Sequence, residues 1–160
     1  MPRIEISLAR QSLVLRNDAG TVLRAYSVST ARNGPGERQG SHCTPRGGHV
    51  VRAKIGAGSA ANTVFVGRRP TGEVWTPELQ AKFPGRDWIL TRILWLSGCE
   101  PGRNRLGDVD TMRRYIYIHG CPDSAELGKP GSIGCVRMRN RDVAELFDRV
   151  PPYTQVEISE

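Results

Sequence analysis

The apolar run at residues 88–96 constrains the fold of this chain more than any other segment. It combines aromatic and aliphatic side chains, among them Trp88, Ile93 and Trp95, with little polar alternation. A short run of this kind is typical of a strand that is buried on both faces of a sheet. We therefore expect residues 88–96 to form a central strand.

The rest of the chain predicts a protein rich in β-structure. Its 18 glycine and 11 proline residues favour many turns over a helical bundle. Apolar and polar residues alternate in three early segments, which predicts an antiparallel meander of strands at residues 3–8, 11–16 and 21–30. Further strands are expected at residues 49–55, 63–66, 114–119 and 153–158. Long loops are expected at residues 32–48, 98–110 and 121–132, and residues 68–87 are expected to be irregular with at most a helical turn at 78–83.

One helix is predicted, at residues 140–150. Val143, Leu146 and Phe147 are spaced so that they lie on one apolar face. Asn140 is expected to cap the N-terminus of this helix, and Pro151 to end it. The chain has 160 residues and no repeat or linker, so we expect a single domain covering residues 1–160.

The chain is basic, with a net charge of +7. A basic surface attracts nucleic acid, anionic membranes or an acidic polymer such as a cell wall. The basic residues are spread along the chain and no nucleic-acid-binding motif is present, so we expect no nucleic-acid partner. No segment has the apolar length of a membrane span, and residues 1–6 read as a strand rather than as a signal peptide. The alternatives are a cytoplasmic protein, export without a cleaved signal, or a mature form.

The four cysteines show no paired spacing. They are Cys43, Cys99, Cys121 and Cys135, and they are too few for a disulfide scaffold. At most one structural disulfide is expected, among the first three. Only His119 and Cys121 have the short spacing that zinc ligands usually show, so we expect no metal site.

The segment from His119 to Arg137 holds the residues with the clearest chemical potential. A thiol is a strong nucleophile only as thiolate, and a nearby cation, base or helix N-terminus favours that form. Cys135 has candidates for all three in Arg137, His119 and the helix predicted to begin at residue 140. We interpret Cys135 as a nucleophile and His119 as its base. The alternative from residue types alone is a buried structural cysteine and an ordinary strand-end histidine.

Glycine and serine residues surround this pair. Gly134 lets the chain turn tightly before the cysteine and expose backbone N–H groups, which are typical of an oxyanion hole. Ser132 is expected to form hydrogen bonds within that turn or to the substrate. Gly120 leaves room beside His119, and a backbone carbonyl there is expected to fix the imidazole tautomer.

Two motifs resemble the catalytic motif of L,D-transpeptidases, the YkuD-type domain. They are Tyr115-Ile116-Tyr117-Ile118-His119-Gly120 and Ser132-Ile133-Gly134-Cys135-Val136-Arg137-Met138, separated by a loop. Four further segments resemble family elements in the same order: residues 11–15, residues 26–30 with 44–47, residues 139–147 and residues 154–158. The resemblance therefore runs from about residue 4 to residue 158.

The resemblance implies a mainly β fold, a β-sandwich of mixed sheets with one helix near the C-terminus and long loops. It implies attack on peptidoglycan stem peptides at the bond between the diamino acid and a terminal D-alanine, through a Cys135 thioester. An amine then takes the acyl group, which gives a 3→3 cross-link or D-amino-acid exchange. Carbapenems typically acylate this cysteine. No cofactor is implied, and a monomer that acts on the cell-wall side is expected.

The resemblance also assigns individual roles. Cys135 is the nucleophile, His119 the general base, and Gly134 with Cys135 the source of oxyanion N–H groups. Arg137 is expected to orient a substrate carboxylate or to support the loop. Tyr117, Ser132 and Gly120 are expected to support the site or the substrate.

Three positions depart from the family pattern. Ile133 replaces a histidine, Ala31 replaces a glycine, and Cys121 replaces a threonine or serine. Cys121 is either an ordinary small-residue replacement or the partner of Cys135 in a redox lock. Alternatives for function are an L,D-carboxypeptidase, a secreted antibacterial effector that targets peptidoglycan, and a basic binding domain without enzymatic activity.

Overall fold

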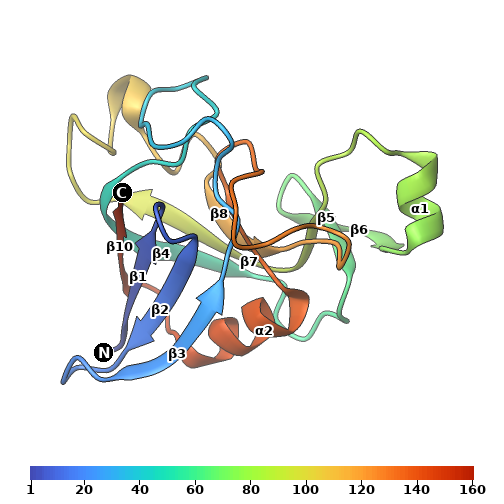
Figure 1. The fold of residues 1–160 in the computed structure, drawn as a ribbon, viewed down its shortest axis with the longest axis horizontal. Helices are drawn as coiled ribbons and strands as arrows, with labels where there is room; N and C mark the ends of the chain where they lie inside the picture. Colours follow the sequence, from blue (N-terminus) through green and yellow to red (C-terminus); the bar gives the residue numbers. More distant parts are fainter.

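The computed structural model describes residues 1–160 and consists of one mixed sheet with two α-helices (Figure 1). The strands are β1 (Arg3–Ser7), β2 (Ser12–Arg16), β3 (Val22–Ser27), β4 (Gly47–Ile55), β5 (Thr63–Val66), β6 (Arg69–Val74), β7 (Ile89–Gly98), β8 (Tyr117–Gly120), β9 (Val136–Met138) and β10 (Gln155–Ser159). The helices are α1 (Pro77–Lys82), α2 (Asn140–Arg149) and a 3₁₀ turn, η1 (Gly107–Val109). The mainly β prediction is confirmed.

The first three strands form the predicted antiparallel meander. They lie in the order β3-β2-β1, and β10 adds to β1 in parallel register. The next strands inward are β4 and β7. The start and the end of the chain therefore pair with each other in the middle of one sheet.

The predicted central strand is β7. It pairs with β4 and β5 along its length and with β8 as well, all antiparallel. Leu90, Ile93 and Leu94 are completely buried. β8 pairs with β7, and β9 pairs with β8. The position of β7 therefore fixes the segment from His119 to Arg137, which is called the functional segment below.

The sheet curls so far that the segment after β3 meets β9, the last strand of the branch that leaves β7 through β8. Beyond β3, Ser29 forms a bridge with Arg137 of β9, with N–H···O distances of 3.0 and 2.8 Å. A second bridge joins Ala31 to Ser132. The two halves of the curled sheet face each other across the core, as expected for the fold class, and the segment after β3 lies directly against the functional motif.

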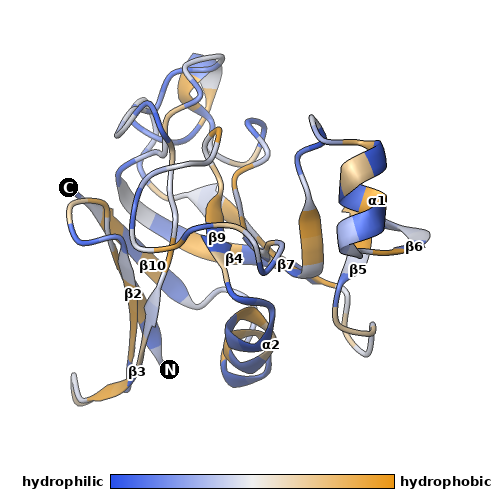
Figure 2. Ribbon diagram, turned by 45° about the vertical axis from the view of Figure 1, so that its right-hand side comes forward, coloured by the Kyte–Doolittle hydropathy of each residue, from blue (hydrophilic) through white to orange (hydrophobic).

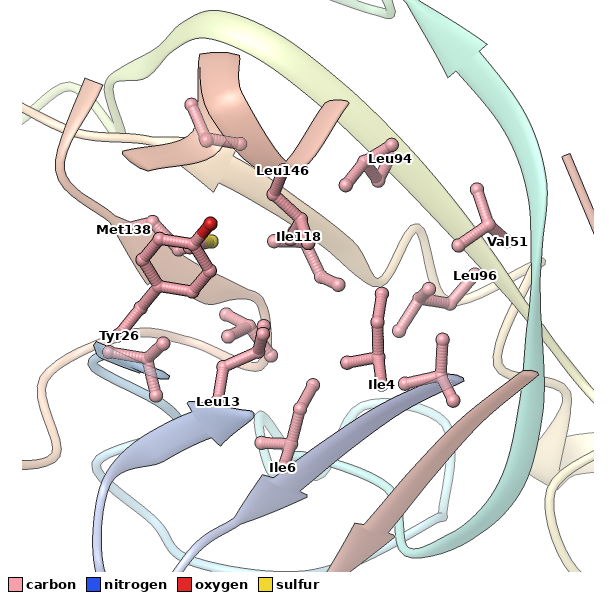
Figure 3. Close-up of a cluster of buried hydrophobic side chains, with 14 of the residues drawn as sticks. Ile4, Ile6, Leu13, Tyr26, Val51, Leu94, Leu96, Ile118, Met138 and Leu146 are labelled. Carbon is pink, nitrogen blue, oxygen red and sulfur yellow. The ribbon is translucent and has the colours of Figure 1, made fainter. Parts of the chain in front are cut away.

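A cluster of twenty buried side chains fills the curled sheet, and Figure 3 shows how residues from β1, β2, β4, β7, β8, β9 and α2 point toward one another in it. Ile118 of β8 and Leu146 of α2 are among its completely buried members. Figure 2 shows that apolar and polar stretches follow each other along the strands and α2. This pattern allows the apolar face of each element to pack into the core while its polar face points away from the core.

The prediction for residues 68–87 missed the strand β6, whereas the helical turn expected at 78–83 is present as α1. These residues contain β6 and the helix α1, which stand at the edge of the molecule beside β5 (Figure 1). Pro70 is tolerated because β6 is an edge strand that pairs only with β5. Thr76 caps α1 by accepting a hydrogen bond from the Leu79 N–H at 3.1 Å, and Pro77 is the first helical residue.

Several strand boundaries differ from the prediction by a few residues, and two differences lie on either side of the segment from His119 to Arg137. Residues 111–115 form turns, so that β8 begins only at Tyr117. Asp110 holds this turn by accepting a hydrogen bond from the Arg113 N–H at 2.9 Å. Asn140 is not the N-cap of α2, because Arg139 occupies that position without a side-chain cap. The Asn140 amide instead bonds to Thr91 at 2.6 Å and to Asn62 at 2.8 Å, and so ties α2 to the sheet.

His49 of β4 is a buried histidine outside the functional segment. Its ring nitrogens contact the Gly47 carbonyl at 2.9 Å and the Thr111 hydroxyl at 3.0 Å, and only 1% of the residue is exposed. Burial lowers the pKa of His49 to about 4, so at mildly acidic pH the unfolded chain binds a proton that the folded chain does not. His49 therefore leaves the free energy of unfolding unchanged above about pH 6.5, and it lowers this free energy as the pH falls toward 4.

We predict that this histidine costs the wild type about 3 kcal/mol of unfolding free energy between pH 6.5 and pH 4. Urea unfolding at several pH values in this range measures the effect. The variant His49→Gln should lose less stability than the wild type over the same interval. An identical acid dependence in both proteins would contradict the assignment.

Candidate active site

The parallel pair β8–β9 sets the geometry of the candidate site. Ile118 lies opposite Val136, and His119 lies opposite Arg137. Ile118 and Val136 enter the main core, so His119 and the residues two positions away face the other side of the sheet. On that side Cys135 and Tyr117 pack with Ile93, the β7 residue that lies opposite His119. The predicted nucleophile and the predicted base thus share one face of adjacent strands.

The turn before Cys135 is built by Ser132. Its hydroxyl donates to the Cys135 carbonyl at 2.6 Å and accepts from the Gly134 N–H at 3.1 Å. Gly134 has a φ of 136°, which L side chains rarely adopt, and a Cβ there would lie 3.0 Å from Ile116 and 3.3 Å from the Cys43 carbonyl. Ser132 therefore supports the loop, which is one of the two roles expected for it, and Gly134 is required by conformation and space.

His119 is completely buried, and its tautomer is set by the backbone. Its Nδ1 contacts the Gly120 carbonyl at 2.6 Å, a contact in which Nδ1 must donate. Nε2 therefore carries no proton and has no hydrogen-bond partner in the protein. Burial lowers the pKa of His119, although the charge of Asp87 opposes this. The neutral imidazole presents a free lone pair, as a general base requires.

The Cys135 sulfur lies between two backbone groups of the β8 region. It accepts a contact from the Tyr117 N–H at 3.3 Å and donates to the Tyr115 carbonyl at 3.4 Å. No hydrogen bond joins it to His119 in this structure. Cys135 is 9% exposed as a residue and belongs to the lining of a pocket described below.

The expected lowering of the cysteine pKa is wrong. Burial raises the pKa of the Cys135 thiol to about 12, although the Tyr117 N–H, Arg137 and Arg114 favour the thiolate. The helix α2 cannot compensate for burial. Its N-terminus at Asn140 lies five residues further along, about 16 Å of extended chain, and the effect of a helix dipole fades within a turn. The resting site therefore holds a neutral thiol and a neutral imidazole.

The two N–H groups that were predicted to bind an oxyanion differ in whether they are free. The Gly134 N–H is occupied by the Ser132 hydroxyl and is not free to bind a substrate oxygen. The Cys135 N–H has no acceptor in the protein. It remains the candidate donor for an oxyanion that develops next to the sulfur.

Arg137 supports the loop rather than the pocket. Its guanidinium donates to the Gly131 carbonyl at 3.2 Å and pairs with Asp87 at 3.3 Å. These contacts match the second of the two roles expected for Arg137. Asp87 was not predicted from the sequence; it brings the segment before β7 to the edge of the site.

A pocket of about 440 Å³ opens over Cys135. Its lining comes from residues 39–42, the β5–β6 turn, the end of the segment before β7, residues 114–117 and the cysteine loop: Gln39, Gly40, His42, Gly67, Arg68, Asp87, Ile89, Arg114, Tyr115, Ile116, Tyr117, Ile133 and Cys135. Ile133, which stands where the family motif has histidine, is 57% exposed at the pocket rim. It therefore offers an apolar surface and no acid–base function.

Arg114 and Thr44 form hydrogen bonds that fix the loops around this pocket, and neither was predicted as a site residue. The Arg114 guanidinium donates to the carbonyls of Gly36 and Cys43, at 3.2 and 2.7 Å, and to the Ser41 hydroxyl at 3.2 Å. The Thr44 hydroxyl donates to the Gly134 carbonyl at 2.9 Å. Residues 32–46 and 99–115 accordingly lie together at the top of Figure 1.

Gly120 and Cys121 contribute to packing rather than to the pocket. A Cβ on Gly120 would lie 2.3 Å from the Asn140 amide oxygen and 2.6 Å from the Leu90 carbonyl, so the room beside His119 is taken by these groups. Cys121 is buried and its sulfur contacts the Met138 carbonyl at 3.3 Å.

The geometry is incompatible with the redox lock considered from the sequence. Gly120 pairs with Met138, so Cys121 and Cys135 lie about four residues apart along the ladder, roughly 13 Å. A disulfide requires Cα atoms within about 7 Å. All four cysteines are free.

Two other features bear on the candidate chemistry. Histidine, cysteine and acidic side chains nowhere form a group of three or more that is suited to hold a metal ion. None of the helices has both the length and the apolar character needed to cross a membrane.

Solved structures share this fold. The L,D-transpeptidase of Xylanimonas cellulosilytica superposes with a TM-score of 0.57 at 21% identity, over 99% of this chain and 60% of that chain. L,D-transpeptidase 3 of Mycobacterium tuberculosis, in complex with a faropenem-derived adduct, gives a TM-score of 0.59 at 15% identity, over 99% of this chain and 61% of that chain. The fold is that of an L,D-transpeptidase catalytic domain.

Sequence comparison gives the same family. The profile of the L,D-transpeptidase catalytic domain, YkuD, matches residues 1–158. The probable L,D-transpeptidase ErfK/SrfK of Salmonella typhimurium is 31% identical over 127 residues, which are 71% of this chain and 39% of that protein. The putative L,D-transpeptidase YkuD of Bacillus licheniformis is 45% identical over 47 residues, which are 29% of this chain and 28% of that protein. The matched segments cover well under half of each of these relatives. With a family profile that matches residues 1–158, the chain belongs to the L,D-transpeptidase catalytic domain family.

Proposed function

We propose that this chain is a cysteine-dependent L,D-transpeptidase that acts on peptidoglycan stem peptides. One observation carries the proposal. Cys135 reaches the floor of a pocket while His119 lies on the same sheet face, with Nδ1 fixed by a carbonyl and Nε2 free of any partner. A buried histidine with this tautomer is suited to accept the proton of a neighbouring thiol.

Because the Cys135 thiol and the His119 imidazole are both neutral at rest, proton transfer accompanies the attack of the sulfur in the first step. His119 Nε2 takes the proton from the Cys135 thiol as the sulfur attacks the carbonyl carbon between the diamino acid and D-alanine. The developing oxyanion is stabilised by the Cys135 N–H. The C–N bond then breaks, the imidazolium gives its proton to the leaving amine, and D-alanine departs. The product of this half-reaction is a thioester of Cys135.

The second half-reaction regenerates the thiol. An amine attacks the thioester carbonyl, His119 accepts a proton from that amine, and the proton returns to the Cys135 sulfur as it leaves. An amine of a second stem gives a 3→3 cross-link, a free D-amino acid gives exchange, and water gives a tripeptide. The faropenem-derived adduct of the Mycobacterium tuberculosis relative supports covalent chemistry in this family.

Incubation of the protein with a disaccharide-tetrapeptide, followed by mass spectrometry of the products, tests the proposal. We expect release of D-alanine together with a cross-linked dimer, and exchange when a free D-amino acid is added. Tripeptide as the sole product would assign the chain to L,D-carboxypeptidases instead. Unchanged substrate under all conditions would contradict both activities.

The proposed substrate also places the site of action on the cell-wall side of the membrane. The net charge of +7 favours association with an acidic wall polymer. Fractionation of cells that produce the native protein, with detection by antibody, tests this placement. Recovery in the cytoplasm alone would contradict it.

A further inference from the structure

Two arginine side chains in the pocket beside Cys135 have no acidic partner. They are Arg68 and Arg114, and neither takes part in any ion pair of the chain. Asp87 is the only carboxylate in the lining, and it pairs with Arg137 at 3.3 Å. The pocket therefore carries uncompensated positive charge next to the sulfur. A ligand with a negative group would complement this charge.

The two arginines differ in the hydrogen bonds that they still have available. Arg114 donates three bonds to the loop that covers the pocket, and it is held there as a structural cation. Arg68 donates a single bond within the protein, from Nη1 to the Tyr117 hydroxyl at 3.1 Å. Because a guanidinium has five N–H groups, most of the fork of Arg68 is free to bind a ligand.

The Arg68 guanidinium is nevertheless held in a fixed place. Its Cζ lies 4.8 Å from the ring centroid of Trp95 and 4.8 Å from that of Tyr115. Tyr117, which receives its hydrogen bond, packs edge-on against Trp95 with the ring centroids 5.8 Å apart. The residue adopts a φ of 65° at the β5–β6 turn, a conformation uncommon for a side chain of this size. A charged fork that is fixed between rings loses little further freedom when it binds.

We propose that Arg68, together with the Tyr117 hydroxyl, forms a subsite that binds a carboxylate group of the donor stem peptide and so places the donor over Cys135. This inference rests on the proposed function. The planar fork matches a carboxylate in a two-bond arrangement, and no protein acid competes for it. Burial raises the pKa of Tyr117, which keeps its hydroxyl proton available for donation to the same carboxylate. Arg137, the other candidate for this role, is bonded to Gly131 and Asp87.

A pair of alkylating agents tests the subsite without any turnover of peptidoglycan. Iodoacetate and iodoacetamide both react by attack of the Cys135 sulfur on the CH₂ carbon with loss of iodide, and they differ in the carboxylate. Peptide mass spectrometry follows the rate at Cys135 alone. We expect Arg68→Gln to lower the ratio of the iodoacetate rate to the iodoacetamide rate about three- to tenfold, because a hydrogen-bonded charge partner is lost.

Two further variants act as controls in the alkylation experiment. Arg68→Lys keeps the charge and is expected to retain part of the rate ratio. Arg69→Gln removes the same charge from the next residue, which is exposed and outside the pocket, and should leave the ratio unchanged. An unchanged ratio in Arg68→Gln, or an equal decrease in Arg69→Gln, would overturn the subsite.

Amidated donors then identify which carboxylate is bound. One donor carries a carboxamide at the terminal D-alanine, and the other a carboxamide on the diamino acid. For wild type we expect one of these changes to lower kcat/KM about 10- to 100-fold, and for Arg68→Gln we expect the same change to have little further effect. Independent, additive losses would contradict the inference. If the wild type processes no stem peptide, the proposed function fails, while the alkylation ratio still decides whether the subsite exists.

Discussion

Replacement of Cys135 by alanine is expected to lower the release of D-alanine and the formation of cross-links by at least about 1000-fold, because no other group can carry the acyl intermediate. The fold should survive, since the change removes only a sulfur at the floor of the pocket. Product analysis by mass spectrometry at matched protein concentrations measures the loss. Thermal unfolding of the same sample shows that the variant is folded.

Cys121→Ala is the matched control for this prediction. Cys121 is a buried thiol too, and burial raises its pKa to about 11, but it lies at the other end of the β8–β9 ladder. We expect this variant to keep its activity. Equal losses in the two variants, or substantial turnover by Cys135→Ala, would remove Cys135 from the role of nucleophile.

Replacement of His119 by glutamine is expected to lower kcat about 100- to 10,000-fold, the usual contribution of a general base. The reason is specific to this site. The raised pKa of Cys135 leaves almost no thiolate at neutral pH, so the sulfur cannot attack unless a base removes its proton. Steady-state kinetics on the tetrapeptide donor measure the effect. His49→Gln, which removes a buried histidine outside the pocket, should retain the activity at neutral pH.

The pH profile of the wild type gives an independent check on the same assignment. Burial lowers the pKa of His119, so the active neutral imidazole persists below the ordinary value of about 6.5. The Cys135 thiol, with its pKa of about 12, stays protonated up to pH 9. We expect kcat/KM to be flat from about pH 6.5 to pH 9. A decline on the alkaline side within this range would indicate a resting thiolate–imidazolium pair and contradict the neutral one.

Much of the fold could be predicted because the strands are local patterns. Residues 63–66 coincide with β5, and residues 88–96 with most of β7. The closure of the sheet could not be predicted in this way. The bridges between Ser29 and Arg137 and between Ala31 and Ser132 join residues about a hundred positions apart, and no local pattern reports such contacts.

That Cys135 and His119 lie near each other could be predicted from motif spacing, and the structure places both on one sheet face. Their ionisation could not be predicted in this way. The sequence places a cation two residues after Cys135 and a helix five residues after it, which favours a thiolate. Burial raises the pKa of Cys135 more than these charges lower it, and this burial depends on Ile93 of β7 and Phe65 of β5, which belong to the same buried cluster as Cys135. The role of Arg68 could not be predicted either, because it depends on contacts distant in sequence. Its aromatic neighbours come from β7 and from the turn before β8.

Intact-protein mass spectrometry after incubation with a carbapenem tests the central claim most directly. A covalent adduct of one carbapenem per chain is expected, mapped to the peptide that contains Cys135 and absent from Cys135→Ala. An adduct that persists in Cys135→Ala, or that maps to Cys43, Cys99 or Cys121, would contradict the claim. The absence of any adduct on the folded wild type would contradict it as well.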